Sequence, residues 1–119
     1  MNHPSVTIEL SYPPSVNHYY RHVGPRVLIS REGRLYRDRV AARLFERGVQ
    51  KRHGRVALEI QAYPPDERRR DLDNLLKSLF DALAYGGLYD DDSNVKKLQI
   101  EMLDSMPPDG MIVVRARTI

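Results

Sequence analysis

The hydrophobic positions of this sequence recur with two different periods. In residues 6–10, apolar and polar side chains alternate, which is the pattern of a half-buried strand. The same alternation returns in three later segments, residues 56–62, 98–102 and 112–116. Residues 27–29 are all apolar and predict one further short strand. The turn-forming residues 107–110 separate the last two alternating segments, and this arrangement predicts a hairpin.

Two other segments have the 3.6-residue period of an amphipathic helix. The first is expected to run from about residue 32 to residue 51, with Ser30 as its N-cap. Its apolar face would consist of Tyr36, Val40, Ala41, Leu44, Phe45 and Gly48. The second repeats through Leu72, Leu75, Leu76, Leu79, Phe80 and Leu83, and ends at Gly86 and Gly87. Residues 15–26 are polar and aromatic and predict a loop.

The order of these elements, β-(β)-α-β-α-β-β, indicates the fold class. We expect an α+β fold in which a mixed β-sheet packs against two main helices. A chain of 119 residues fits one compact domain, so this domain is expected to cover residues 1–119.

The composition excludes several classes of protein. The chain has no cysteine, which excludes disulfide scaffolds, zinc ribbons and thiol catalysis. It has no apolar run of the roughly 20 residues that span a bilayer, and its start does not resemble a signal peptide. We therefore expect a soluble, cytoplasmic protein that does not enter a membrane.

Charge is distributed unevenly along the chain. The net charge is +3, but residues 1–70 carry 14 basic and 7 acidic side chains, whereas residues 71–119 carry 5 and 9. Of the 19 basic residues 15 are arginines, the side chain that binds phosphate in a bidentate manner and stacks on bases. This bias favours a nucleic acid as the partner.

Acidic residues gather around the second predicted helix. Asp71 and Asp73 stand at its start, Lys77 and Asp81 follow at four-residue intervals, and residues 90–92 are three consecutive aspartates after the helix. In one interpretation they cap the helix and form surface ion pairs. If the aspartate turn instead folds back beside the helix start, carboxylates about 4 Å apart repel by around 4 kcal/mol at an effective dielectric constant of 20, and need a cation. Their hard oxygens favour Mg²⁺ or Mn²⁺.

Two basic or aromatic segments suit DNA. Arg68, Arg69 and Arg70 directly precede the acidic residues, where cations beside a metal site would serve phosphodiester cleavage. Residues 12–21 mix aromatic, hydrogen-bonding and basic side chains, a composition suited to stacking on bases and to backbone contacts, although a rigid surface loop would look the same. His18 and His22 are four apart but lack the glutamate of a zinc-protease motif, so a histidine metal site is not favoured.

Four segments in order resemble the RusA family of Holliday-junction resolvases. They are Pro-Pro-Ser-Val-Asn-His-Tyr-Tyr-Arg at 13–21, Glu-Gly-Arg-Leu-Tyr-Arg-Asp at 32–38, Arg-Arg-Asp-Leu-Asp-Asn-Leu at 69–75 and Asp-Asp-Ser-Asn-Val at 91–95. The third is followed by Lys77, Phe80, Asp81, Ala82 and Leu83, as in the family. Asp90 makes a run of three acids where the family has two, and we align the last two because Val95 keeps its spacing from them.

The resemblance implies a homodimeric, Mg²⁺-dependent endodeoxyribonuclease that resolves four-way DNA junctions by symmetric nicking in recombination and repair. Mn²⁺ would substitute for Mg²⁺, no small-molecule cofactor is expected, and the enzyme would act in the nucleoid. The implied catalytic residues are Asp71, Asp73 and Asp92, which would hold the metal, together with Lys77. We assign DNA binding to Arg68, Arg69, Arg70, Asn74, Asn17, Tyr20 and Arg21.

Three points complete the hypothesis. Asp81 is expected to be structural, as the ion-pair partner of Lys77. A two-fold dimer would match the near two-fold symmetry of a junction that needs two nicks. The alternatives are a metal-dependent nuclease for other branched DNA such as flaps and forks, a non-catalytic nucleic-acid-binding protein, and an RNA-binding or ribosome-associated protein.

Overall fold

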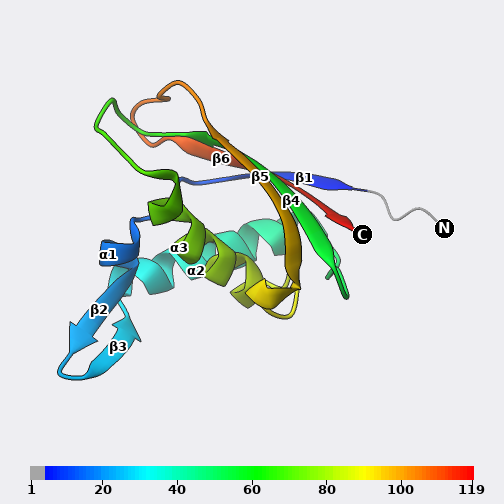
Figure 1. The fold of residues 1–119 in the computed structure, drawn as a ribbon, viewed down its shortest axis with the longest axis horizontal. Coiled ribbons are helices and arrows are strands. Elements are labelled where there is room, and N and C mark those ends of the chain that lie inside the picture. Colours follow the sequence, from blue (N-terminus) through cyan, green and yellow to red (C-terminus); the bar gives the residue numbers. More distant parts are fainter. Residues whose placement is uncertain (1–4) are drawn as a thin grey trace.

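A computed structural model describes residues 5–119 of the chain (Figure 1). Its strands are β1 (Val6–Leu10), β2 (Tyr20–Val23), β3 (Arg26–Ile29), β4 (Val56–Tyr63), β5 (Val95–Met102) and β6 (Met111–Thr118). Its helices are α1 (Val16–Tyr19), α2 (Arg31–Glu46), α3 (Leu72–Tyr85) and the short 3₁₀ helix η1 (Asp92–Asn94). No helix in this part of the chain is long and apolar enough to cross a membrane.

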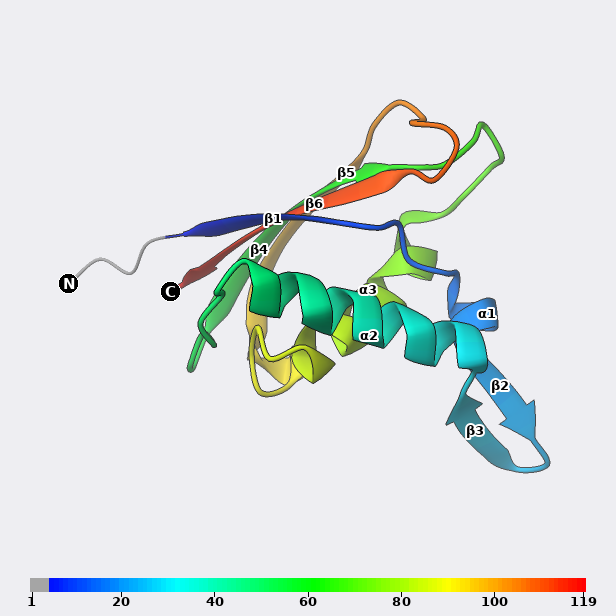
Figure 2. The same cartoon turned by 180° about the vertical axis from the view of Figure 1, so that it is seen from behind.

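A four-stranded mixed sheet in the order β1-β6-β4-β5 forms one layer. β4 pairs in parallel with β5, while β6 is antiparallel to both β4 and β1. Both main helices, α2 and α3, lie on the same face of this sheet (Figure 1, Figure 2). The α+β class, the mixed sheet and the two covering helices are therefore as predicted.

The predicted hairpin between the last two strands is wrong. β4 lies between β5 and β6, so these two strands do not pair. The crossover through α3 places β5 parallel to β4 on one side, and residues 103–110 then pass the end of β4 to reach its other side. Along this path the N–H of Met106 donates to the carbonyl of Pro64 at 2.7 Å. Turn-forming residues showed where the chain reverses, but not which strand becomes the neighbour.

The helix α2 is shorter than expected. It ends at Glu46 rather than at residue 51, because Gly48 adopts a positive φ of 63° just beyond it. Its buried row is Gly33, Tyr36, Val40 and Leu44. Phe45, predicted on the apolar face, is 87% exposed, since it is rotated by one residue from that row. α3 follows its prediction better, with Leu75, Leu79 and Leu83 buried against the sheet.

Residues 15–26 are not a loop, contrary to the prediction. They form α1, β2 and the start of β3, and the β2–β3 hairpin projects from the body of the molecule (Figure 2). Ser30 is the N-cap of α2, as predicted, and its hydroxyl accepts from the N–H of Gly33 at 2.9 Å. The same hydroxyl donates to the carbonyl of Tyr19 at 2.9 Å. This side chain therefore joins the base of the hairpin to the start of α2.

Candidate active site

Two predicted catalytic carboxylates lie at the start of α3. Asp71 occupies the N-cap position with extended backbone, but its side chain accepts no capping hydrogen bond. Asp73 lies in the first turn, and both residues are exposed. The interpretation that Asp71 serves only as a helix cap is therefore not supported by its contacts. Its carboxylate remains available to a ligand.

A cleft of about 460 Å³ opens beside Asp71. From the predicted DNA-binding set it gathers Arg68, Arg69, Arg70 and Asn74. The segment before and within α1 also lines the cleft, and α2 contributes two residues; they are Tyr12, Pro13, Pro14, Ser15 and His18, with Glu32 and Arg39. This cleft combines several guanidinium groups with a free carboxylate, which suits a phosphate held next to a metal ion.

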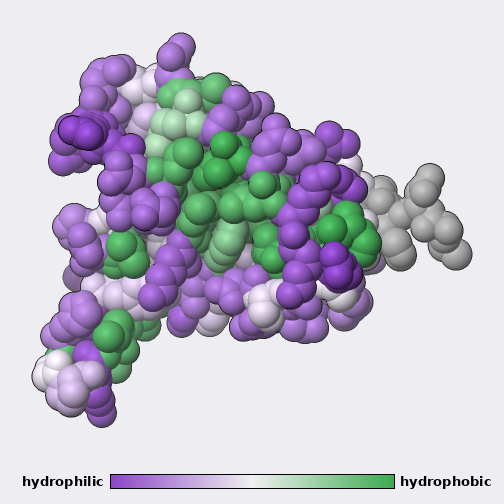
Figure 3. Space-filling view, viewed as in Figure 1, coloured by the Kyte–Doolittle hydropathy of each residue, from purple (hydrophilic) through white to green (hydrophobic). Residues whose placement is uncertain are grey.

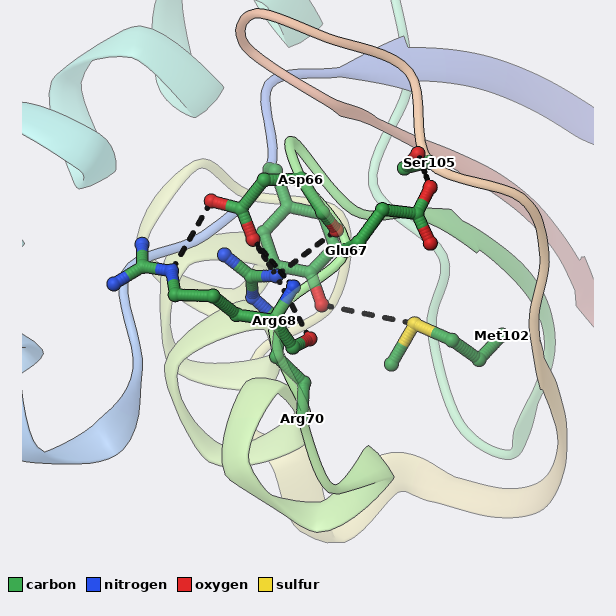
Figure 4. A network of polar contacts seen from close by, with 7 residues as sticks. Asp66, Glu67, Arg68, Arg70, Met102 and Ser105 are labelled. Carbon is green, nitrogen blue, oxygen red and sulfur yellow. Dashed lines mark hydrogen bonds and ion pairs between the residues drawn. The ribbon is translucent and has the colours of Figure 1, made fainter.

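Asp66 fixes the loop that carries the three arginines (Figure 4). Its carboxylate accepts from Arg70 Nη1 at 2.6 Å and from Arg68 Nε at 3.2 Å, and also from the backbone N–H of Arg68 at 2.9 Å. The Arg70 hydrogen bond, followed by that of the Arg68 backbone, holds the pKa of Asp66 well below its usual range. The Arg70 guanidinium also lies 5.8 Å from the ring centre of Tyr12.

The same network reaches the end of β5. Tyr12 donates to the sulfur of Met102 at 3.8 Å, and Ser105 donates to Glu67 (Figure 4). Because Arg70 is engaged by Asp66, the exposed Arg69 is the member of the triplet most available to a phosphate. The loop between β4 and α3 is thus held in place by its own side chains.

The ammonium group of Lys77 lies close to the aromatic ring of Tyr20. Its Nζ lies 5.0 Å from the ring centre of Tyr20, within the range of a cation–π interaction. Lys77 lies one turn after Asp73 on α3, so these two side chains share one face of the helix. The structure thereby connects Tyr20, predicted to bind DNA, with the predicted catalytic lysine.

The predicted ion pair between Lys77 and Asp81 is wrong. Asp81 accepts from Arg37 Nε of α2 at 2.9 Å, and the Tyr19 hydroxyl donates to the same oxygen. Arg37 also donates to the Tyr19 hydroxyl at 3.2 Å and stacks on Tyr85 at 4.9 Å. Burial, with added effects from Asp81, raises the pKa of Tyr19. Asp81 is structural as expected, but it joins α3 to α2, which leaves Lys77 without that neutralising partner.

The aspartate turn does not fold back beside the start of α3. η1 contacts α3 near its C-terminal end instead (Figure 1). The 14 residues of α3 span about 20 Å, which separates this turn from Asp71. Within residues 5–119, no group of three acidic or histidine side chains is placed to hold a metal ion. A single chain does not bring Asp71, Asp73 and Asp92 together.

The three consecutive aspartates have different environments. Asp90 accepts from Lys51 Nζ at 2.8 Å, and this contact lowers the pKa of Asp90. Asp91 caps η1 by accepting from the N–H of Ser93 at 2.9 Å, in a capping box with Asn94. Asp92 is exposed in the first turn of η1, and its charge contributes to raising the pKa of Tyr20, after burial and Asp81. Of the three aspartates, Asp92 is the one whose carboxylate, within residues 5–119, neither pairs with a lysine nor caps η1.

The remaining predicted DNA contacts lie outside the cleft. Asn17 on α1 and Arg21 on β2 are exposed, at the base of the projecting hairpin. They do not line the cleft that contains Asp71. The structure thus divides the predicted set between the cleft and the surface around Tyr20.

A family model described as endodeoxyribonuclease RusA matches residues 11–115, which include the cleft, Lys77 and the aspartate turn. The chain belongs to the RusA family. It is 44% identical over 99 residues to the crossover junction endodeoxyribonuclease RusA of Escherichia coli strain K12, covering 80% of this chain and 78% of that protein. It is also 46% identical over 92 residues to the protein of that name from Enterobacteria phage 82, covering 74% of each chain. The predicted resemblance is therefore confirmed.

Sequence reasoning missed two contributors to this RusA-family site. Arg39 lines the cleft from α2, 32 positions before Asp71 in the chain, and Asp66 orients the arginine loop. Arg39 belongs to the charged face of an ordinary amphipathic helix, so its position gave no signal. Asp66 was detectable in principle, because an aspartate four residues before an arginine after two prolines is typical of a stabilised turn.

Proposed function

We propose that this protein is a structure-specific endodeoxyribonuclease that resolves four-way DNA junctions by paired, Mg²⁺-dependent nicks. The observation that carries this proposal is the free carboxylate of Asp71 at the rim of an arginine-lined cleft. Carboxylates beside guanidinium groups are suited to a metal ion and the phosphate that it contacts. Acting in recombination and repair, the enzyme would work on the DNA of the nucleoid.

The donor atoms at the start of α3 fit a hard divalent cation. Asp71 and Asp73 are exposed, and Mg²⁺ is commonly held by one or two carboxylates with substrate phosphate and water completing the shell. Nucleases of this type depend in general on a divalent metal ion. We assign Mg²⁺, with Mn²⁺ as a substitute, because the donors are oxygens and the chain has no cysteine.

Different side chains of this protein would have different roles at the scissile phosphate. Asp71 and Asp73 would hold the cation, which when bound lowers the pKa of a water molecule and stabilises charge on phosphate oxygens. Lys77, kept from Asp81 by the Arg37 ion pair and supported by Tyr20, would neutralise the charge that develops on the phosphate. Arg69, with Arg68, would bind the flanking backbone, and Asn74 lines the same cleft.

The third carboxylate requires a second chain. Asp92 lies beside the opposite end of α3 from Asp71, so a site that uses all three aspartates would take Asp92 from a partner. A homodimer with two-fold symmetry supplies two such sites. Two matched sites also suit a junction with two equivalent strands to cut.

A cleavage assay on a synthetic mobile four-way junction tests the function. We expect paired symmetric nicks in Mg²⁺, none in EDTA, and weak or no cutting of linear duplex, flaps and forks. Asp73→Asn should reduce cleavage by about a hundredfold or more while junction binding stays within about threefold. The matched control is Asp38→Asn, an exposed aspartate on α2, which should cut normally. Tight binding with no cut by the unaltered protein would contradict the proposal, as would a fully active Asp73→Asn variant.

A further inference from the structure

β5 is an edge strand with an exposed backbone. It pairs with β4 alone, at one end of the order β1-β6-β4-β5. The N–H of Leu103 donates to the carbonyl of Ala62 at 2.8 Å, and backbone groups alternate sides along a strand. The N–H and C=O groups of residues 98, 100 and 102 therefore point away from the sheet. They form a row of hydrogen-bonding groups that is available to another strand.

The helix-facing side of β5 is also incompletely covered. Leu98 of β5 is 39% exposed, and Leu72 of α3 is 37% exposed. Four further apolar side chains of the same two elements are only partly buried, namely Leu76, Phe80, Ile100 and Met102. Figure 3 shows a continuous hydrophobic area across this face of the molecule, over β5 and α3. At the opposite edge, the corresponding β1 side chains Ile8 and Leu10 are only 1% and 4% exposed.

The residues of β5 are complementary to a second copy of β5. Around a two-fold axis at Gln99, antiparallel pairing places Leu98 opposite the partner's Ile100, and both have outward backbone groups. The same register places Lys97 opposite the partner's Glu101, on the face away from the helices. This pair occurs twice because of the symmetry. Moving the axis by one residue would put Lys97 opposite Gln99 or Leu103 and would lose the charge pairing.

We propose that two copies of this chain associate through β5, antiparallel about a two-fold axis at Gln99, with the apolar surfaces of β5 and α3 buried between them. The proposal rests on the homodimer of the proposed function and names its surface. Opposite charges across strands and an apolar centre are the features expected of such an interface. The two sheets would become one continuous sheet.

The arrangement also accounts for the separated carboxylates. α3 lies in the crossover between the parallel strands β4 and β5, so it runs antiparallel to both. A two-fold axis at Gln99 would set the two α3 helices antiparallel, with the start of one level with η1 of the other. Asp71 and Asp73 of one chain would then approach the partner's Asp92.

A cysteine at the axis tests the register. The chain has no cysteine, so Gln99→Cys introduces one thiol per protomer. In this register the two Cα atoms form a non-hydrogen-bonded pair about 4.5 Å apart, within the range of a disulfide. We expect mild oxidation to give a covalent dimer in high yield. The matched control is Gln61→Cys, at a position of β4 that is also exposed and on the same face, which should stay uncrosslinked.

Exchange of charges tests the interface in solution. Lys97→Glu and Glu101→Lys should each weaken the dimer about tenfold or more in sedimentation equilibrium, because like charges would then face each other twice. The double variant Lys97→Glu/Glu101→Lys should return within about threefold of the unaltered chain. A dimer whose dissociation constant is unchanged by these exchanges, and which gives no Gln99→Cys crosslink, would overturn this surface but not the homodimer. A monomer that still resolves junctions would overturn both the surface and the homodimer.

Discussion

The contact between Arg37 and Asp81 is predicted to stabilise the fold, whereas Lys77 and Asp81 should be nearly uncoupled. Arg37 Nε lies 2.9 Å from Asp81, and the two side chains are 26% and 31% exposed. Exposed pairs contribute about 0.2–1 kcal/mol, and hydrogen bonds to charged groups that are partly shielded contribute about 1.5–3 kcal/mol. We therefore expect a coupling energy of about 1–2 kcal/mol for this pair.

A double-mutant cycle in urea measures this coupling. The variants are Arg37→Met, which retains the apolar stem, Asp81→Asn and their combination, all at one protomer concentration. The matched cycle uses Lys77→Met with Asp81→Asn, and its coupling should not exceed about 0.5 kcal/mol, the value for a pair four residues apart on a helix. A larger coupling for Lys77 than for Arg37 would refute the reasoning, because Asp81 would then neutralise the lysine that we propose to be catalytic.

Two further predictions concern packing and pH. Gly33→Ala should lower the free energy of unfolding in urea by about 2 kcal/mol, because a Cβ there would collide with the Tyr19 carbonyl and approach Ile29 Cγ1 to 2.8 Å. The control is Leu35→Ala, at an exposed neighbouring position, which should change the stability little. A Gly33→Ala variant as stable as this control would contradict the close approach. Burial raises the pKa of Tyr19, Tyr36 and Tyr89 above 10.0, so the folded state keeps phenol protons that the unfolded state releases. The free energy of unfolding should therefore stay constant below about pH 10 and decrease above it. The decrease should be less steep in Tyr36→Phe, and a stability that is constant to about pH 11 would be inconsistent with these shifts.

The elements with a clear period were predictable because burial acts on them locally. β1 has the predicted bounds, and α3 buries Leu75, Leu79 and Leu83 as its spacing requires. Ser30 was recognisable as a cap because its hydrogen bond reaches only three residues along the chain. Each of these features depends on neighbours close in sequence.

Apart from the end of α2, which Gly48 sets locally, the failures at the site and in the sheet depended on long-range packing. Asp81 pairs with Arg37, 44 residues earlier, rather than with Lys77, because the contact of α2 with α3 brings the Arg37 guanidinium next to the Asp81 carboxylate. β5 and β6 do not pair because β4 lies between them. The length of α3 sets the position of residues 90–92. No local pattern reports these distances. The proposed roles of Asp71, Asp73, Lys77 and Asp92 came from motif resemblance, and the separation of Asp92 from the first two came only from the structure.

Complementation between two inactive chains tests the two-chain site most directly. Asp73→Asn and Asp92→Asn protomers carrying different tags would be co-expressed, purified as the mixed dimer, and assayed on the four-way junction with Mg²⁺. If each site combines Asp71 and Asp73 of one chain with the partner's Asp92, the mixed dimer has one fully intact site. We expect it to nick one strand of the junction, while each parental dimer stays inactive. A purified mixed dimer that binds the junction but makes no nick would contradict the account.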